Sequence, residues 1–94
     1  MQKSLYKVKH STAFKRELKI ARRRGYNMGT LNEVVDALAD GKSLDPKHND
    51  HALIGNWKGY RECHITPDWL LIYKIDAGVL ILTLQRTGTH SDLF

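Results

Sequence analysis

The sequence predicts an α+β fold in which a helical hairpin packs on one face of a small, mostly antiparallel sheet. Two amphipathic helical patterns follow each other in the first half of the chain, and three strand-like runs joined by short turns fill the second half. A short alternating run precedes the helices, so the order is β-α-α-β-β-β. The length of 94 residues and a hydrophobic content of 41% fit a single domain, residues 1–94, with one modest core.

The N-terminal part of the chain predicts an edge strand followed by a helix. Residues Leu5–Lys9 alternate between polar and apolar side chains, as in a strand with one solvated face. Ser11 can cap the helix that follows. Apolar residues recur at i, i+4 and i+7 from Phe14 to Ala21, which predicts a core-facing stripe, and Gly25 is a typical helix C-terminal signal.

A second helix is predicted to begin between Asn27 and Thr30. Thr30 and Glu33 have the spacing of a capping box. Apolar residues between positions 31 and 38 follow the i, i+3, i+4, i+7 pattern, and Gly41 marks the end. The short connection between the two helices predicts a helical hairpin.

The rest of the chain predicts a long loop and an antiparallel meander. Residues Lys42–Asn56 show no clear period, and a loop this long in a small domain is often functional. The predicted strands are Trp57–Ile65, Trp69–Ile75 and Val79–Arg86, and the tail Thr87–Phe94 runs past the sheet edge. The second of these strands is almost continuously apolar, so we expect it to be central and buried on both faces.

The charge of the chain favours an anionic partner. The formal net charge is +5 and the sequence pI is about 9.5. Basic side chains concentrate in the first predicted helix, largely off its apolar stripe, and we select five as RNA-binding candidates: Lys15, Arg16, Lys19, Arg22 and Arg23. A solvated helix face with no partner is an equally good explanation of this cluster.

Membrane and export functions are not expected. The longest apolar runs, such as Trp69–Tyr73, are far shorter than a membrane span, and the N-terminus has no export signal pattern. Cys63 is the single cysteine, so no intrachain disulfide can form. We therefore expect a cytoplasmic protein without a membrane partner.

Histidines of the second half, with an aspartate and an arginine, contain the groups that RNA cleavage by internal transfer requires. A base must take the proton of the 2′-OH, an acid must protonate the leaving 5′ oxygen, and a cation should stabilise the phosphoryl oxygens. Two histidines, or a histidine and an aspartate, can transfer the protons, and an arginine can bind phosphate with two hydrogen bonds. The catalytic candidates are His51, His64, Asp68, Arg86 and His90.

The predicted connectivity brings several of these residues to one end of the sheet. His64 ends one strand, Asp68 starts the next, and Arg86 ends the last strand beside it. His90 follows four residues later. Strict alternation, however, places Arg86 on the same face as the apolar residues before it, so either a β-bulge re-aims the strand end or Arg86 lies beyond the covered core.

Each candidate also has a structural explanation. A single histidine is more often a surface or hydrogen-bonded residue than a catalyst, Asp68 can be a turn residue, and Arg86 can be an ion-pair partner. Trp69 and Phe94 can stack on an RNA base or belong to the core or its rim. The sequence has no H-E-x-x-H or paired-cysteine spacing and no nucleotide fingerprint, so we expect no metal and no cofactor.

Two stretches of the sequence resemble a known family. The strings DHAL-x-G-x-WKGYRE-x-H-x-x-PDWLLIYK, at residues 50–74, and RTGTH-x-x-LF, at residues 86–94, are similar nearly residue for residue to the YafQ branch of the RelE/ParE superfamily of bacterial toxins. The order of elements also resembles the RelE-like fold, whereas the N-terminal helices match only in pattern. The resemblance implies a toxin of a type II toxin–antitoxin system that cuts mRNA in the ribosomal A site.

The resemblance also implies partners and residue roles. His51, His64, Asp68, Arg86 and His90 match active-site positions of the family, and Phe94 matches a C-terminal aromatic implicated there. Trp69, which follows the motif aspartate, is expected to help position the RNA. The expected partners are a cognate antitoxin, in an oligomeric complex, and the ribosome with its mRNA; no catalytic metal is implied.

Two other functions stay open from the sequence. One is a non-enzymatic, ParE-like toxin that inhibits DNA gyrase, in which the histidines are structural. The other is a basic nucleic-acid-binding module whose affinity falls with salt and that forms no products.

Overall fold

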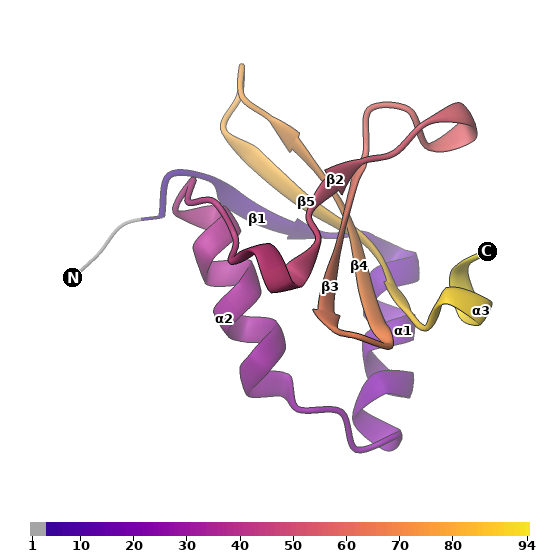
Figure 1. Cartoon of the computed structure of the whole chain (residues 1–94). Coiled ribbons are helices and arrows are strands. Elements are labelled where there is room, and N and C mark those ends of the chain that lie inside the picture. Colours follow the sequence, from indigo (N-terminus) through magenta and orange to yellow (C-terminus); the bar gives the residue numbers. More distant parts are fainter. Residues whose placement is uncertain (1–3) are drawn as a thin grey trace.

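The structure, a computed structural model, describes residues 4–94 and has the predicted α+β architecture (Figure 1). Its elements are β1 (Lys7–His10), α1 (Thr12–Arg23), α2 (Met28–Ala39), the 3₁₀ turn η1 (Pro46–His48), β2 (His51–Ala52), the 3₁₀ turn η2 (Gly55–Trp57), β3 (Arg61–Thr66), β4 (Trp69–Asp76), β5 (Ile81–Gly88) and α3 (His90–Leu93). Among these residues no helix has the length and apolar character needed to cross a membrane.

The five strands form one sheet in the order β1-β5-β4-β3-β2. The edge strand β1 pairs in parallel with β5, and the other pairs are antiparallel. Figure 1 shows α1 and α2 joined by a short connection, with α3 next to the C-terminus and on the same side of the view as α1. The predicted mostly antiparallel sheet with a helical hairpin is confirmed.

The helix starts follow local capping. The Ser11 hydroxyl accepts a hydrogen bond from the Phe14 amide at 2.9 Å, as predicted. The predicted Thr30 and Glu33 capping box is wrong: the Asn27 side chain accepts from the amides of Gly29 and Thr30, at 2.9 and 3.3 Å. The helix begins at Met28, within the predicted range between Asn27 and Thr30.

Several predicted boundaries in the second half are also wrong. The expected strand from Trp57 starts only at Arg61, because the chain first passes through η2 and Gly59, whose φ is +94°. The turn before β5 extends to Leu80, at φ +56°, so β5 spans Ile81–Gly88. The expected long loop contains β2, which pairs with β3, and the tail contains α3.

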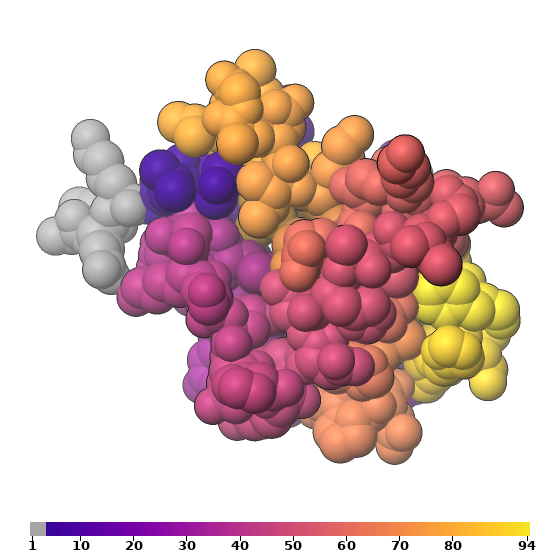
Figure 2. All heavy atoms as spheres, turned by 45° about the horizontal axis from the view of Figure 1, so that its top comes forward, coloured from indigo at the N-terminus to yellow at the C-terminus, as the bar shows by residue number. Residues whose placement is uncertain are grey.

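The sheet is packed on both faces. The main core lies between the helices and the sheet and includes Phe14, Leu31, Leu71 and Leu82. On the opposite face Leu93 of α3 packs on Leu70 and Ile72 of β4, and Leu53, Trp57 and Tyr60 border this second cluster. In Figure 2 the C-terminal residues accordingly lie against atoms from the middle of the chain. Burial of β4 on both faces is confirmed.

A β-bulge in β5 settles the direction of Arg86. The register pairs Leu84 with Tyr73 but Arg86 with Ile72, so Gln85 is the extra residue. Residues paired across neighbouring strands share a face. Arg86 is thus on the face of Ile72, opposite the helical hairpin, and the bulge that the alternation pattern allowed is confirmed.

Candidate active site

The sheet register places three of the predicted residues on the face opposite α1 and α2. One row across the sheet runs through His51, Glu62, Ile72 and Arg86. The neighbouring row contains His64, which is paired with Leu70. Because paired residues share a face, strand pairing alone aligns side chains that come from β2, β3 and β5.

A groove at one end of this face brings together His64, Asp68 and His90. Its volume is about 530 Å³, and it is lined by Tyr26, His64, Pro67, Asp68, Leu70, Thr89, His90 and Ser91. The β3–β4 turn supplies one wall and the start of α3 another. The predicted meeting of this turn with the end of the last strand is confirmed, and it places two imidazoles and a carboxylate around one hollow.

A helix cap and an ion pair orient α3 and therefore His90. Thr89 caps α3, since its hydroxyl accepts from the Asp92 amide at 3.2 Å while Asp92 accepts from the Thr89 amide at 2.8 Å. Arg24 of α1 donates to Asp92 at 2.6 Å. This bond to Arg24 and the one from the Thr89 amide hold the pKa of the Asp92 carboxyl well below its usual range.

Glu62 connects His51 and His64, and sequence reasoning missed it. Its Oε1 lies 3.5 Å from His51 Nε2 and 4.0 Å from His64 Nε2, and its side chain is only 8% exposed. The Nδ1 atoms lie near carbonyls, of Asn49 for His51 at 2.7 Å and of Pro67 for His64 at 3.3 Å. One buried carboxylate therefore lies close to both imidazoles. The signal was present in the sequence, because Glu62 and His64 are two apart in a strand.

Asp50, the residue before His51, anchors the short strand β2. It accepts from the Tyr73 hydroxyl at 2.5 Å and from Arg61 at 3.3 Å. Burial and, next, this bond to Asp50 raise the pKa of Tyr73, so the hydroxyl stays a donor. A two-residue strand is thereby held at the position that presents His51.

Arg86 does not line the groove and instead pairs with Glu17 of α1. Its Nε donates to both carboxylate oxygens at 2.8 and 3.0 Å, and its Nη2 donates at 2.7 Å. The Thr87 amide adds a bond to the same carboxylate at 3.2 Å. Glu17 raises the pKa of the guanidinium. The ion-pair alternative for Arg86 is therefore present in the structure, on the same sheet face as the histidines.

The two aromatic candidates lie in different surroundings. Trp69 is 2% exposed, and its indole N–H donates to the Thr87 hydroxyl at 2.8 Å. Trp69, the first residue of β4, points to the helical side of the sheet and is buried in the core. The expectation that its ring stacks on RNA is therefore wrong, because the ring is not exposed. Phe94 is 54% exposed and lies beside His90, with ring centroids 5.1 Å apart.

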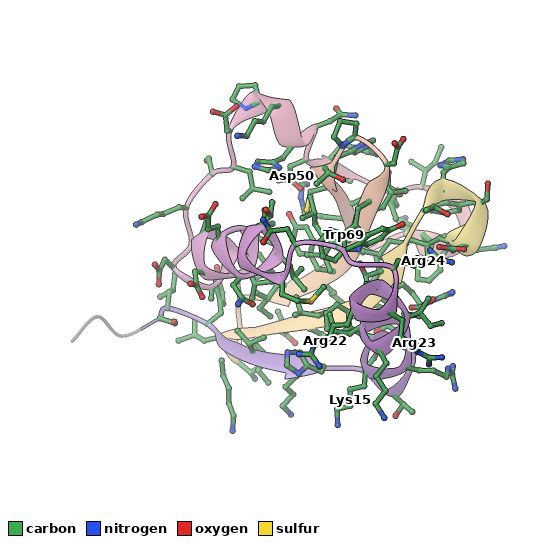
Figure 3. All side chains as sticks on the ribbon, turned by 90° about the horizontal axis from the view of Figure 1, so that it is seen from below. Lys15, Arg22, Arg23, Arg24, Asp50 and Trp69 are labelled. Carbon is green, nitrogen blue, oxygen red and sulfur yellow. The ribbon has the colours of Figure 1, made fainter. Side chains whose placement is uncertain are left out.

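The basic candidates form an exposed surface of α1, and all five are solvent-exposed: Lys15, Arg16, Lys19, Arg22 and Arg23. Figure 3 shows the labelled members Lys15, Arg22 and Arg23 around α1, with Trp69 inside the molecule. Within residues 4–94 no group of three or more histidine, cysteine or acidic side chains is placed to hold a metal ion.

Comparison with known proteins identifies the family. Residues 6–94 match the family described as "Bacterial toxin of type II toxin-antitoxin system, YafQ". The mRNA interferase toxin YafQ of Escherichia coli K12 is 38% identical over 88 residues, covering 93% of this chain and 94% of the relative. The putative toxin YafQ of Haemophilus influenzae is 39% identical over 90 residues, covering 90% and 88%.

Solved structures agree with this match. The crystal structure of YafQ from E. coli BL21(DE3) has a TM-score of 0.88 at 36% identity, covering 95% of this chain and 98% of that one. YafQ in the E. coli DinJ–YafQ toxin–antitoxin complex gives 0.87 at 36%, with 96% and 98% coverage. A metal-bound toxin from Helicobacter pylori gives 0.90 at 42%, with 95% and 99% coverage. The chain therefore belongs to the YafQ family of bacterial toxins of type II toxin–antitoxin systems.

Proposed function

We propose that this protein is a ribosome-dependent mRNA endonuclease, an mRNA interferase that cuts the codon in the A site and arrests translation. The observation that carries the proposal is the groove in which His64, Asp68 and His90 converge at one end of the sheet. Its groups can exchange protons, and the groove is open to a single-stranded substrate. The E. coli relative is named an mRNA interferase, which supports the same chemistry here.

The reaction is an internal phosphoryl transfer. The 2′ oxygen bonds to the neighbouring phosphorus while the bond from phosphorus to the 5′ oxygen breaks; a base removes the 2′ proton and an acid protonates the 5′ oxygen. We assign proton transfer to His90 and Asp68, with His51 and His64 sharing the task through Glu62. The products are a cyclic phosphate and a free 5′-OH, so no oxidant or co-reactant is needed.

Arg86 supplies phosphate stabilisation in this mechanism. Among its contacts within residues 4–94, Glu17 engages Nε and Nη2, which leaves Nη1 for a phosphoryl oxygen. Alternatively the guanidinium exchanges Glu17 for the RNA. In either case the cation is already on the sheet face that carries His51.

The partners follow from the same proposal. The exposed basic surface of α1 contacts ribosomal RNA, the antitoxin, or both in turn. E. coli YafQ forms a complex with DinJ, and we propose a cognate antitoxin in an oligomeric complex for this chain. The protein acts in the cytoplasm as one toxin domain, residues 1–94, without a cofactor or a catalytic metal.

Primer extension on translated mRNA after induction tests the function. We expect new 5′ ends at A-site codons with the wild type, and a loss of roughly 100- to 10,000-fold for His90→Ala and Asp68→Ala. The matched control is His10→Ala, which removes an exposed histidine on β1 that does not line the groove. If His90→Ala, Asp68→Ala and Arg86→Ala all cut mRNA at wild-type strength, the catalytic assignment is wrong.

Three further arms separate the alternatives. DNA breakage or supercoiling inhibition with intact translated mRNA would establish gyrase poisoning instead. A chelator selective for transition metals, which spares the Mg²⁺ of the ribosome, should leave cleavage unchanged; loss that is restored by one metal would overturn metal independence. Failure to copurify with the product of an adjacent small gene would count against the antitoxin.

A further inference from the structure

Tyr26 is the aromatic side chain that the fold places in the groove of His64, Asp68 and His90. It lies in the connection between α1 and α2, and it is half-buried. None of the sequence patterns selected it, because it belongs to neither helical stripe nor either motif string. The helical hairpin nevertheless provides one wall of the groove, and Tyr26 is the residue that forms this wall.

The backbone at the end of α1 sets the direction of Tyr26. Gly25 has a φ of +79°, its amide donates to the Arg22 carbonyl at 3.0 Å, and the Tyr26 amide donates to the Ala21 carbonyl at 3.1 Å. These are the two bonds of a Schellman motif, in which the residue after the glycine turns back toward the last turn of the helix. Asn27 then caps α2 at once, so the connection has little freedom.

The ring of Tyr26 is supported from behind by the core. It lies on Trp69 with ring centroids 5.0 Å apart and an interplanar angle of 52°. The indole of Trp69 is held by the Thr87 hydroxyl at 2.8 Å, and that hydroxyl donates to the Leu70 carbonyl at 2.7 Å. The buried Trp69 therefore acts as a platform, and Tyr26 is the aromatic of this pair that reaches the groove.

We propose that Tyr26 is an RNA-binding residue that packs against a base beside the scissile phosphate. This inference rests on the proposed nuclease function. Single-stranded RNA is commonly held by stacking of unpaired bases on aromatic side chains, and a pre-oriented ring loses little conformational entropy on binding. Tyr26 thus takes the RNA-positioning role that was expected of Trp69, and it contacts the base from the wall of the groove that the helical hairpin provides.

The test compares Tyr26→Leu and Tyr26→Phe with Tyr6→Leu. Tyr6 is a matched control, because it is also a half-buried tyrosine that packs on the helix-side core, and it does not line the groove. Affinity is measured for ribosomes programmed with mRNA carrying a 2′-deoxy nucleotide at the cut, which cannot be cleaved. Cleavage of normal mRNA is measured in parallel, and thermal melting checks the fold.

We expect Tyr26→Leu to weaken binding and kcat/KM by about 5- to 150-fold, the range for losing one base–aromatic contact. Tyr26→Phe should stay within about 2-fold, because the ring remains. Tyr6→Leu should bind RNA like the wild type. A folded Tyr26→Leu variant with wild-type binding and cleavage would overturn the proposal.

Photo-crosslinking of the wild type covers the case in which Tyr26→Leu does not fold. The A-site codon carries 5-iodouridine, and the crosslinked residue is identified by mass spectrometry. A crosslink at Tyr26 supports the proposal, and crosslinks confined to other residues overturn it. If the wild type leaves translated mRNA intact, the nuclease function itself fails, and this result is distinct from both.

Discussion

Arg86 and Glu17 form a two-pronged ion pair between β5 and α1, although they are 69 residues apart in the sequence. The contact closes the end of β5 that β1 does not cover, because β1 pairs only with Ile81–Leu84. The backbone amide of Thr87 lies at this edge of β5, and it also donates to Glu17. The Glu17 carboxylate thus accepts a hydrogen bond from a backbone amide at the strand edge, and it also orients the Arg86 guanidinium that we assign to phosphate stabilisation.

Removing this carboxylate should cost both stability and activity. Glu17→Ala leaves the partly buried Arg86 without its partner, and we expect a loss of about 1.5–3 kcal/mol in the free energy of unfolding. Cleavage of translated mRNA should fall as the guanidinium loses its orientation, and Glu17→Gln should show smaller losses. Urea denaturation and primer extension check both. Glu33→Ala, an exposed glutamate of α2, is the control, and equal stability of the two alanine variants would contradict the prediction.

Glu62 should matter for catalysis through His51 and His64. Glu62→Gln keeps the shape but removes the charge near both Nε2 atoms, so we expect cleavage to fall by up to about 100-fold and its pH profile to change. Measurement of the cleavage rate against pH checks this, with Glu62→Asp as the conservative variant. A double variant with His51→Ala should show less than additive losses. Additive losses would mean that Glu62 and His51 act separately.

Trp69 should behave as a core residue. Trp69→Phe removes the bond to the Thr87 hydroxyl, and we expect about 0.5–1.5 kcal/mol of lost stability. Below its melting temperature the variant should cut mRNA close to the wild-type rate. Thermal denaturation and cleavage at two temperatures check this. A strong loss of activity in a variant as stable as the wild type would contradict a purely structural role for Trp69.

The Arg24–Asp92 bond makes the attachment of α3 dependent on pH. The pKa of Asp92 is lower in the folded protein than in the unfolded chain, where an aspartate carboxyl titrates at about 3.9. Its contribution to stability is therefore fully present above that value, and it is lost as the pH falls through the folded-state pKa. We expect Asp92→Asn to be less stable than the wild type at pH 7 and to converge with it in acid. Urea denaturation from pH 7 to 2 checks this, with Asp36→Asn as control; a constant difference across this range would contradict it.

Local patterns were enough for the helices and the central strand. Phe14 and Ala21 lie in the core as their spacing predicts, and the apolar run that starts at Trp69 is buried on both faces. These features depend on neighbours within one or two turns. Boundaries failed where the backbone took unexpected conformations, as at Gly59 and Leu80. The start of α2 lay within its predicted range, but a competing side chain, Asn27, provided the cap.

The sequence by itself determined the class of fold, the family motifs and the meeting of His64, Asp68 and His90 at one groove, because a meander must bring a turn and a strand end together. Only the tertiary structure decided which groups face them. The bulge at Gln85 places Arg86 on the sheet face opposite the helical hairpin, and core packing buries Trp69 behind Tyr26. Such contacts join segments far apart in the chain, and their geometry depends on register and packing that no local pattern encodes.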